Sequence, residues 1–292
     1  MNLQTARDQL CSDEADTIIQ GLDFLARQGS LSDLAQIMRL IDQEDIAVRK
    51  TAITTAASII KHNLLNRFNE ISPEMRIKLG TILTSLDPKV IDEISQDLFS
   101  KDEQRRLLAV QILGLLRKHP SVRKMMATLV KDRDVKIRAT AINLLGKMIG
   151  PNDQELVLAL LNDPDKRVRA NTVEALESLG NRRMVPILLR LRMDPNNRTR
   201  GNVLKALYNL GHKDIEADIV TMLSLKDPLM KASALWVVSQ IDLNSKKIED
   251  AAAEHLLSFN DMINDNAKKT LVSLKTPRAK GYLNYLDNAL NK

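Results

Sequence analysis

The chain has 292 residues, of which 44% are hydrophobic, 27% charged and only 3% aromatic, and its net charge is +6. With 10 glycines and 9 prolines, this composition excludes a disordered chain and indicates helices packed through aliphatic side chains. A single cysteine, Cys11, excludes an internal disulfide framework, and the absence of long apolar runs predicts a cytoplasmic protein without membrane insertion.

The N-terminal part of the chain predicts helices of ordinary length. The first begins after Ser12, which we expect to cap it, and ends at Gly29. A second is expected from about Ser32 to Ile41, and a third, apolar on one face, from Thr51 to Leu65. Residues 1–30 are expected to form an N-terminal cap on the first repeat.

The middle of the chain repeats itself with a constant step of 31 residues. A basic residue recurs at this step, and four residues before each stands a residue type that favours helix N-caps. The regular pairs are Asp134/Arg138, Asp165/Arg169, Asn196/Arg200 and Asp227/Lys231. Less regular copies are Asp45/Arg49, Ser72/Arg76, Asp102/Arg106 and Asn264/Lys268. Their uneven intervals predict length changes in the loops between helices, and self-similarity of this kind indicates a solenoid.

Each unit predicts a helix A, a tight turn and a helix B. Gly180 and Gly211 stand where a helix end requires a left-handed residue. The repeats are expected over 31–275 of a single solenoid spanning 1–292, which a capping helix over 276–292 would close. The side chains expected to cover its last core layer are Tyr282, Leu283 and Leu286.

The unit D-x-x-V-R-x-x-x-x-x-A-L-x-x-L-G, as Asp165–Gly180 shows it, resembles HEAT repeats. It is most similar to the short HEAT-like units first noticed in phycobilin lyases. The resemblance covers roughly residues 13–275 and implies an all-α, right-handed α-solenoid. It further implies that A helices lie outside and B helices line a concave groove.

The column of basic residues has two interpretations. A row of arginines could bind phosphate groups. In HEAT-like arrays, however, this residue typically binds the aspartate or the carbonyls of the adjacent turn and forms a ladder between repeats. We favour the ladder, since an aspartate four residues ahead also suits an ion pair along the helix.

B-helix positions that the core does not require predict a partner-binding stripe of small polar side chains. Its members are Thr140, Asn143, Asn171, Glu174, Asn202, Lys205, Tyr208, Ser233 and Trp236. A solvated face would show the same pattern. Trp236 is the only tryptophan and could be a binding hot spot or core filler; Tyr208 is expected to be exposed.

The middle of the chain is basic, because residues 101–150 hold 12 Lys/Arg against 4 Asp/Glu. The predicted basic patch comprises Arg105, Arg117, Lys118, Arg123, Lys124, Arg182, Arg183 and Arg190. An acidic protein partner or a nucleic acid would explain it. Residues 101–200 contain no Phe, Tyr or Trp on which bases could stack, which favours the protein.

Enzyme signatures are weak. The histidines are His62, His119, His212 and His255, which lie far apart in sequence, and no phosphate loop or nucleophile elbow occurs. We therefore expect a non-catalytic scaffold for protein–protein interaction, without cofactor or metal. A nucleic-acid-binding solenoid is the alternative, and a HEAT-like lyase or glycosylase-type enzyme the third. The sequence does not determine the oligomeric state.

Overall fold

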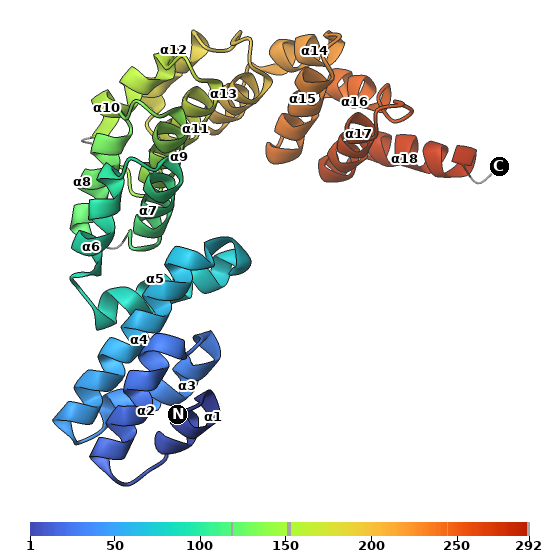
Figure 1. Cartoon of the computed structure of the whole chain (residues 1–292). Helices are drawn as coiled ribbons and strands as arrows, with labels where there is room; N and C mark the ends of the chain where they lie inside the picture. Colours follow the sequence, from blue (N-terminus) through green and yellow to red (C-terminus); the bar gives the residue numbers. More distant parts are fainter. Residues whose placement is uncertain (118, 151–152, 244, 291–292) are drawn as a thin grey trace. The chain divides into compact units, whose positions relative to one another are not determined.

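The structure, a computed structural model, describes residues 1–117, 119–150, 153–243 and 245–290. In this part of the chain all regular secondary structure is helical, which confirms the predicted all-α fold (Figure 1). The chain divides into two compact units, Met1–Met126 and Ala127–Lys292. One continuous solenoid over 1–292 remains a prediction.

The first unit begins with α1 and α2, and 3-10 turns interrupt several of its later helices. Its elements are α1 (Leu3–Gln9), α2 (Ala15–Gln28), η1 (Leu31–Asp33), α3 (Leu34–Ile37), η2 (Met38–Asp42), α4 (Ile46–Asn66), η3 (Phe68–Glu70), α5 (Pro73–Leu86), α6 (Val90–Gln96), η4 (Asp97–Phe99) and α7 (Glu103–Leu115). Helix α8 (Pro120–Leu129) spans the boundary between the units.

The N-terminal cap contains a helix that periodicity does not reveal. Helix α1 has 7 residues, too few for an apolar stripe, and it packs on α2 through Ala6 and Leu10. Arg7 Nε donates to buried Asp33 Oδ1 at 2.6 Å. The expected Ser12 cap is wrong: Glu14 is the N-cap residue, and Ser12 Oγ accepts from the Glu14 amide just outside the helix.

The short interval between Arg49 and Arg76 has a structural cause. Helix α4 runs on to Asn66, and only the 3-10 turn η3 separates it from α5. The interval is short because this repeat lacks an A helix. The prediction that the length changes lie in loops is therefore wrong at this position. Arg76 still behaves as in other units: Nε donates to Ile71 O at 2.8 Å, and the guanidinium lies 4.2 Å from the Phe68 ring centroid.

The second unit alternates short A helices with longer B helices. Its elements are α9 (Val135–Leu145), α10 (Gln154–Ala159), η6 (Leu160–Asn162), α11 (Lys166–Ser178), η7 (Arg182–Met184), α12 (Val185–Leu189), α13 (Asn197–Asn209), α14 (Glu216–Ser224), α15 (Pro228–Gln240), α16 (Lys246–Ala253), α17 (Asp261–Leu274) and α18 (Pro277–Leu290). Figure 1 shows α10, α12 and α14 along one side of this unit, and α9, α11, α13 and α15 along the inner side of its bend.

Local chemistry fixes the B-helix starts. All seven predicted caps from Asp45 to Asp227 accept a backbone N–H of the first helical turn. The predicted cap Asn264 is wrong, because Asn260 Oδ1 accepts from Ile263 N and α17 starts four residues earlier. The side-chain amide of Asn264 instead donates to Leu256 O. The ladder residue stands four residues after the cap, and in α17 this position is Asn264, so Lys268 lies a full turn beyond it.

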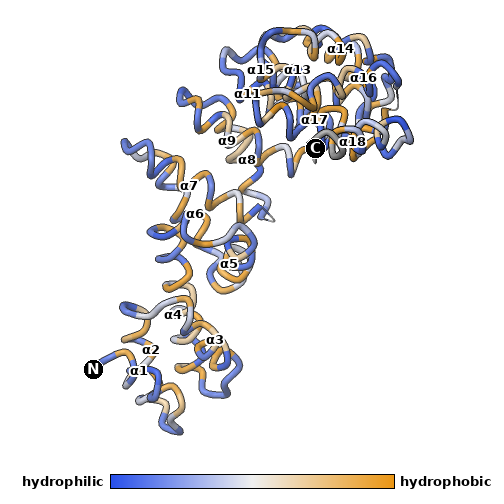
Figure 2. Tube along the Cα trace, turned by 90° about the vertical axis from the view of Figure 1, so that its right-hand side faces the viewer, coloured by the Kyte–Doolittle hydropathy of each residue, from blue (hydrophilic) through white to orange (hydrophobic). Residues whose placement is uncertain are grey.

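The helix ends and the core also match the repeat. Gly180 and Gly211 have φ of +63° and +99°, as predicted for left-handed helix ends. Most apolar residues of the B helices are buried, while several polar ones, Asn171 and Asn202 among them, are buried as well. Figure 2 shows the resulting alternation of hydrophobic and hydrophilic residues along the trace. At the C-terminal end, α18 packs on α16 and α17, with Leu286 buried and Tyr282 half-buried.

Candidate functional site

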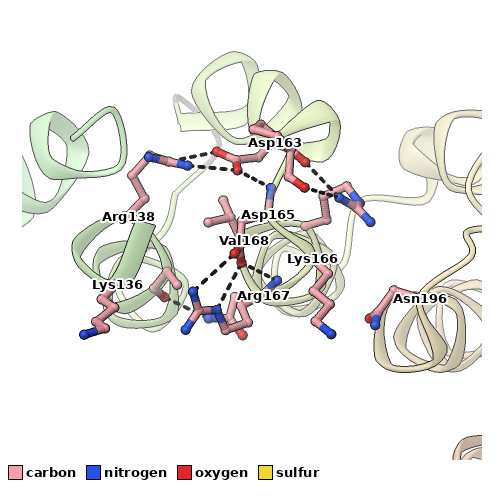
Figure 3. Close-up of polar contacts among 12 residues, drawn as sticks. Lys136, Arg138, Asp163, Asp165, Lys166, Arg167, Val168 and Asn196 are labelled. Atoms are coloured by element: carbon pink, nitrogen blue, oxygen red, sulfur yellow. Dashed lines mark hydrogen bonds and ion pairs between the residues drawn. The ribbon is translucent and has the colours of Figure 1, made fainter. Parts of the chain in front are cut away.

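The turns of the second unit contain the predicted ladder. Arg138, in the first turn of α9, donates through Nε and Nη2 to Asp163 Oδ2 and Oδ1 at 2.9 and 3.2 Å (Figure 3). Its Nη1 donates to Asp132 O and Arg133 O in its own turn. The Asp163 hydrogen bond raises the pKa of Arg138 above its usual value.

The next unit repeats this geometry. Arg169 donates through Nε and Nη2 to Asp194 at 3.0 and 3.2 Å and through Nη1 to Asp163 O and Pro164 O. Arg138 and Arg169 therefore hold consecutive repeats of the second unit together, which confirms the ladder interpretation for these two residues. Arg49 and Arg106 show the carbonyl side of the pattern, because they donate to Gln43 O and Ser100 O.

The predicted partner-binding stripe divides by depth. Asn171 Nδ2 donates to Ala139 O at 2.8 Å, and Asn202 Nδ2 donates to Ala170 O at 3.1 Å. Both asparagines are buried, so they join successive B helices and present little surface to a partner.

Tyr208 differs from expectation: it is buried, and its hydroxyl donates to Asp242 O. Burial raises the pKa of Tyr208 above 10, and the Asp242 charge acts in the same direction. Thr140 and Ser233 are half-buried, and Ser233 Oγ accepts from Asn197 Nδ2 at 2.8 Å.

The accessible members of the stripe lie in two adjoining clefts. One, of about 350 Å³, is lined by α9 and α11 and includes Asn143 and Lys147. The other, of about 560 Å³, is lined by α11, α13 and α15 and includes Lys205 and Trp236. Glu174 and Ser178 line both clefts, so the two clefts adjoin each other on one surface. We call this surface of α9, α11, α13 and α15 the B face.

Lys205 is the central charge of the larger cleft. Its Nζ donates to Glu177 Oε2 at 3.0 Å and lies 5.6 Å from the centroid of the Trp236 ring. Trp236 is 38% exposed, which answers the question the sequence left open. At the adjoining wall, Arg198 Nη2 donates to Glu174 Oε1 at 3.1 Å. The cleft thus combines an accessible aromatic face with charges of both signs.

Sequence reasoning missed several residues of the cleft. Glu177, Ser178 and Asn209 line it, and Asn209 Nδ2 donates to Glu177 Oε1 at 2.6 Å. They lie in the second half of their helices, eight or nine residues after the basic column, at Arg169+8, Arg169+9 and Arg200+9. Residues eight and nine positions after each basic residue, had they been included with those two and five positions after it, would have predicted them.

The predicted basic patch is divided between the two compact units. Arg105, Arg117, Arg123 and Lys124 belong to the first unit, and Arg105 Nε pairs with Asp97 Oδ1 at 2.8 Å. Arg182, Arg183 and Arg190 are exposed on η7 and just after α12, on the A side of the second unit. Lys118 lies outside the described residues. Arg182, Arg183 and Arg190 are therefore not part of the B face.

Sites for other chemistry are sparse. Among the residues described, no group of three or more His, Cys, Asp or Glu side chains could hold a metal ion. Cys11 is exposed, with Gln36 Nε2 3.4 Å from its Sγ. Within the same ranges, no helix has the length and apolar character to cross a bilayer.

Further clefts lie outside the B face, two of them larger than its own. In the first unit, a polar cleft of about 720 Å³ lies beside α4, η3 and α7. At the C-terminal end, α16 and α18 enclose a largely apolar cleft of about 760 Å³, lined by Leu257 and Tyr285 among others. The sequence predicted neither, because both depend on how the helices dock.

Comparison with known proteins identifies the repeat. The family model described as HEAT repeats matches residues 88–177 and 154–228. Residues 88–228 are HEAT repeats. The finer likeness to phycobilin lyase units remains a prediction, and no curated protein matches the sequence.

Solved structures give the same fold. Structures of Kap121p, alone and bound to the SUMO protease Ulp1p, both have a TM-score of 0.51. Their sequence identities to this HEAT-repeat chain are 15% and 14%, and each match covers 99% of this chain. The chain spans only 39% of the length of each solved chain, and at this identity the likeness concerns the fold alone.

Proposed function

We propose that the protein is a non-catalytic, cytoplasmic interaction scaffold that binds a protein partner on the B face of its second unit. The observation that carries this proposal is the exposed Trp236 in the cleft of about 560 Å³, beside Lys205 and Glu177. Tryptophan concentrates binding energy at protein interfaces, because it offers a large rigid surface with a polar edge.

The binding mode depends on which side chains are free to contact a partner. Asn171 and Asn202 are committed to neighbouring helices, so recognition would rest on Trp236, Lys205, Glu174 and the exposed Asn143. A partner segment would place an apolar side chain on Trp236 and polar groups against the charged wall. Kap121p, which has a similar fold, has been solved bound to the SUMO protease Ulp1p, and this supports the mode by analogy.

The competing function is nucleic-acid binding through the basic residues. Phosphate contacts release counterions, so such binding would weaken steeply as salt rises. Pull-downs from native lysate at low and moderate salt, with and without nuclease, separate the two functions. A stoichiometric protein that survives both treatments is the expected result. Loss of binding after nuclease would assign the protein to nucleic acid instead.

A further inference from the structure

The arginine ladder of the second unit stops at Arg200. Arg138 and Arg169 each pair with the aspartate 25 residues further on, Asp163 and Asp194. The residue 25 positions after Arg200 is Leu225, which cannot accept a hydrogen bond through its side chain. The donor of the third pair is therefore present without its acceptor.

Arg200 is nevertheless buried like a paired residue. It is 4% exposed, and its Nε has no hydrogen-bond partner although the atom is inaccessible. Nη2 donates to Met193 Sδ at 3.3 Å, and a thioether is a weak acceptor. Within the described ranges Arg200 forms no ion pair. Burial of a guanidinium in this state is unfavourable, and a bound carboxylate would relieve it.

The turn at Leu225 has kept the shape that presents an acceptor. Leu225 has φ −68° and ψ 152°, close to the −59° and 137° of Asp163. A carboxylate at that place would thus meet a backbone like that of the complete pairs. Leu225 is 37% exposed and Met193, which contacts Arg200, is 60% exposed, so both side chains border solvent. Methionine has three rotatable side-chain bonds and can move aside at small cost.

We propose that Arg200 is a carboxylate-binding site, in which a ligand carboxylate occupies the place of the missing ladder aspartate. Its two oxygens would accept from Nε and Nη2, as the carboxylates of Asp163 and Asp194 do. The source is a small free carboxylate or an acidic side chain of a peptide. The site lies in the turns between A and B helices, so it is independent of the proposed partner binding on the B face.

The test observes the guanidinium directly by NMR of the arginine Nε–Hε group. The Arg200 resonance is assigned by its loss in Arg200→Lys. The full chain is titrated with sodium acetate and with an acetylated hexaglutamate peptide, against sodium chloride and a hexaglutamine peptide at matched ionic strength. We expect a saturable shift of the Arg200 resonance with a carboxylate probe and no shift of Arg169, which is already paired.

Leu225→Asp supplies the missing acceptor from within the chain. In this variant the Arg200 resonance should be displaced before titration and should no longer respond, while Leu225→Asn should respond like the wild type. Saturation by acetate would indicate a free carboxylate as ligand, and a response to the peptide alone an acidic segment. The proposal is overturned if neither probe shifts the resonance, if chloride shifts it equally, or if Leu225→Asp responds unchanged.

A measurement without ligand guards against misfolded variants. If the site is a vacant ladder position, Leu225→Asp has a higher thermal midpoint than Leu225→Asn, and the neutral substitution Arg200→Gln removes this difference. Equal midpoints for the two Leu225 variants would mean that Arg200 does not receive a carboxylate there.

Discussion

Arg169 and Asp194 form a two-pronged ion pair that joins one repeat to the next, with donor–acceptor distances of 3.0 and 3.2 Å. The side chain of Asp194 is only 5% exposed, and its Oδ1 also accepts from the Asn196 amide at 2.8 Å. This carboxylate therefore ties a turn, a helix start and a neighbouring helix together.

Asp194→Asn should destabilise the second unit, because it leaves the Arg169 guanidinium without its counter-charge while keeping the acceptor for Asn196. We expect a loss of about 3 kcal/mol in the free energy of unfolding, measured by urea denaturation. The exposed pair Arg198–Glu174 offers a matched control: Glu174→Gln should cost less than about 1 kcal/mol. Equal effects of the two substitutions would contradict a structural role for the ladder.

The Asn202→Ala variant tests whether the buried asparagines stabilise the stack of helices and do not contact a partner. Its amide donates to Ala170 O and to Glu174 Oε1, the latter at 2.7 Å. Removing both bonds should lower the free energy of unfolding by about 1–2 kcal/mol, measured in the same way. The exposed Asn143→Ala should change stability by less than about 0.5 kcal/mol. If the Asn202→Ala protein were as stable as the wild type but did not bind the partner, Asn202 would be shown to contact the partner.

His255 should make stability depend on pH. Burial lowers the pKa of His255 below 6.5, and the positive charge of Lys231 acts in the same direction. The unfolded chain then binds the proton more tightly than the folded one. Stability is therefore full above pH 6.5 and falls as the pH drops through 6.5 toward the folded pKa. Denaturation profiles between about pH 5 and pH 8 should show this fall, reduced in His255→Gln. An unchanged profile in His255→Gln would show the effect to lie elsewhere.

Trp236 allows the B face to be observed without a label, since it is the only tryptophan. Its 38% exposure predicts emission that acrylamide quenches efficiently in the free protein. Bound partner should shift the emission to shorter wavelength and protect the ring from quenching, because the indole leaves water. Quenching that stayed the same in a saturated complex would place the interface away from Trp236.

The features that sequence predicted are those set by local chemistry at fixed spacing. The caps from Asp45 to Asp227 and the left-handed glycines depend on residues within one or two turns of the repeat. The ladder was predicted as a type of contact, but its acceptor was not: Arg169 pairs with Asp194, 25 residues on, and not with Asp165, four residues ahead. Depth within the stack was not predictable, because Thr140, Asn171 and Asn202 all stand two residues after the basic column, yet Thr140 is half-buried and both asparagines are buried. Helix α1 and the shortened unit at η3 escaped because each is too short to show a period.

The central claim is that a protein partner binds the B face through Trp236, and a quantitative pull-down with three forms of the chain tests it most directly. Wild type, Trp236→Ala and Phe99→Ala would be compared after nuclease treatment at moderate salt, since Phe99 is an exposed aromatic residue of the first unit. The proposal predicts that Trp236→Ala loses the bound protein, at a cost of about 2 kcal/mol or more in binding, while Phe99→Ala retains it. Equal recovery of the same protein by wild type and Trp236→Ala would contradict the claim.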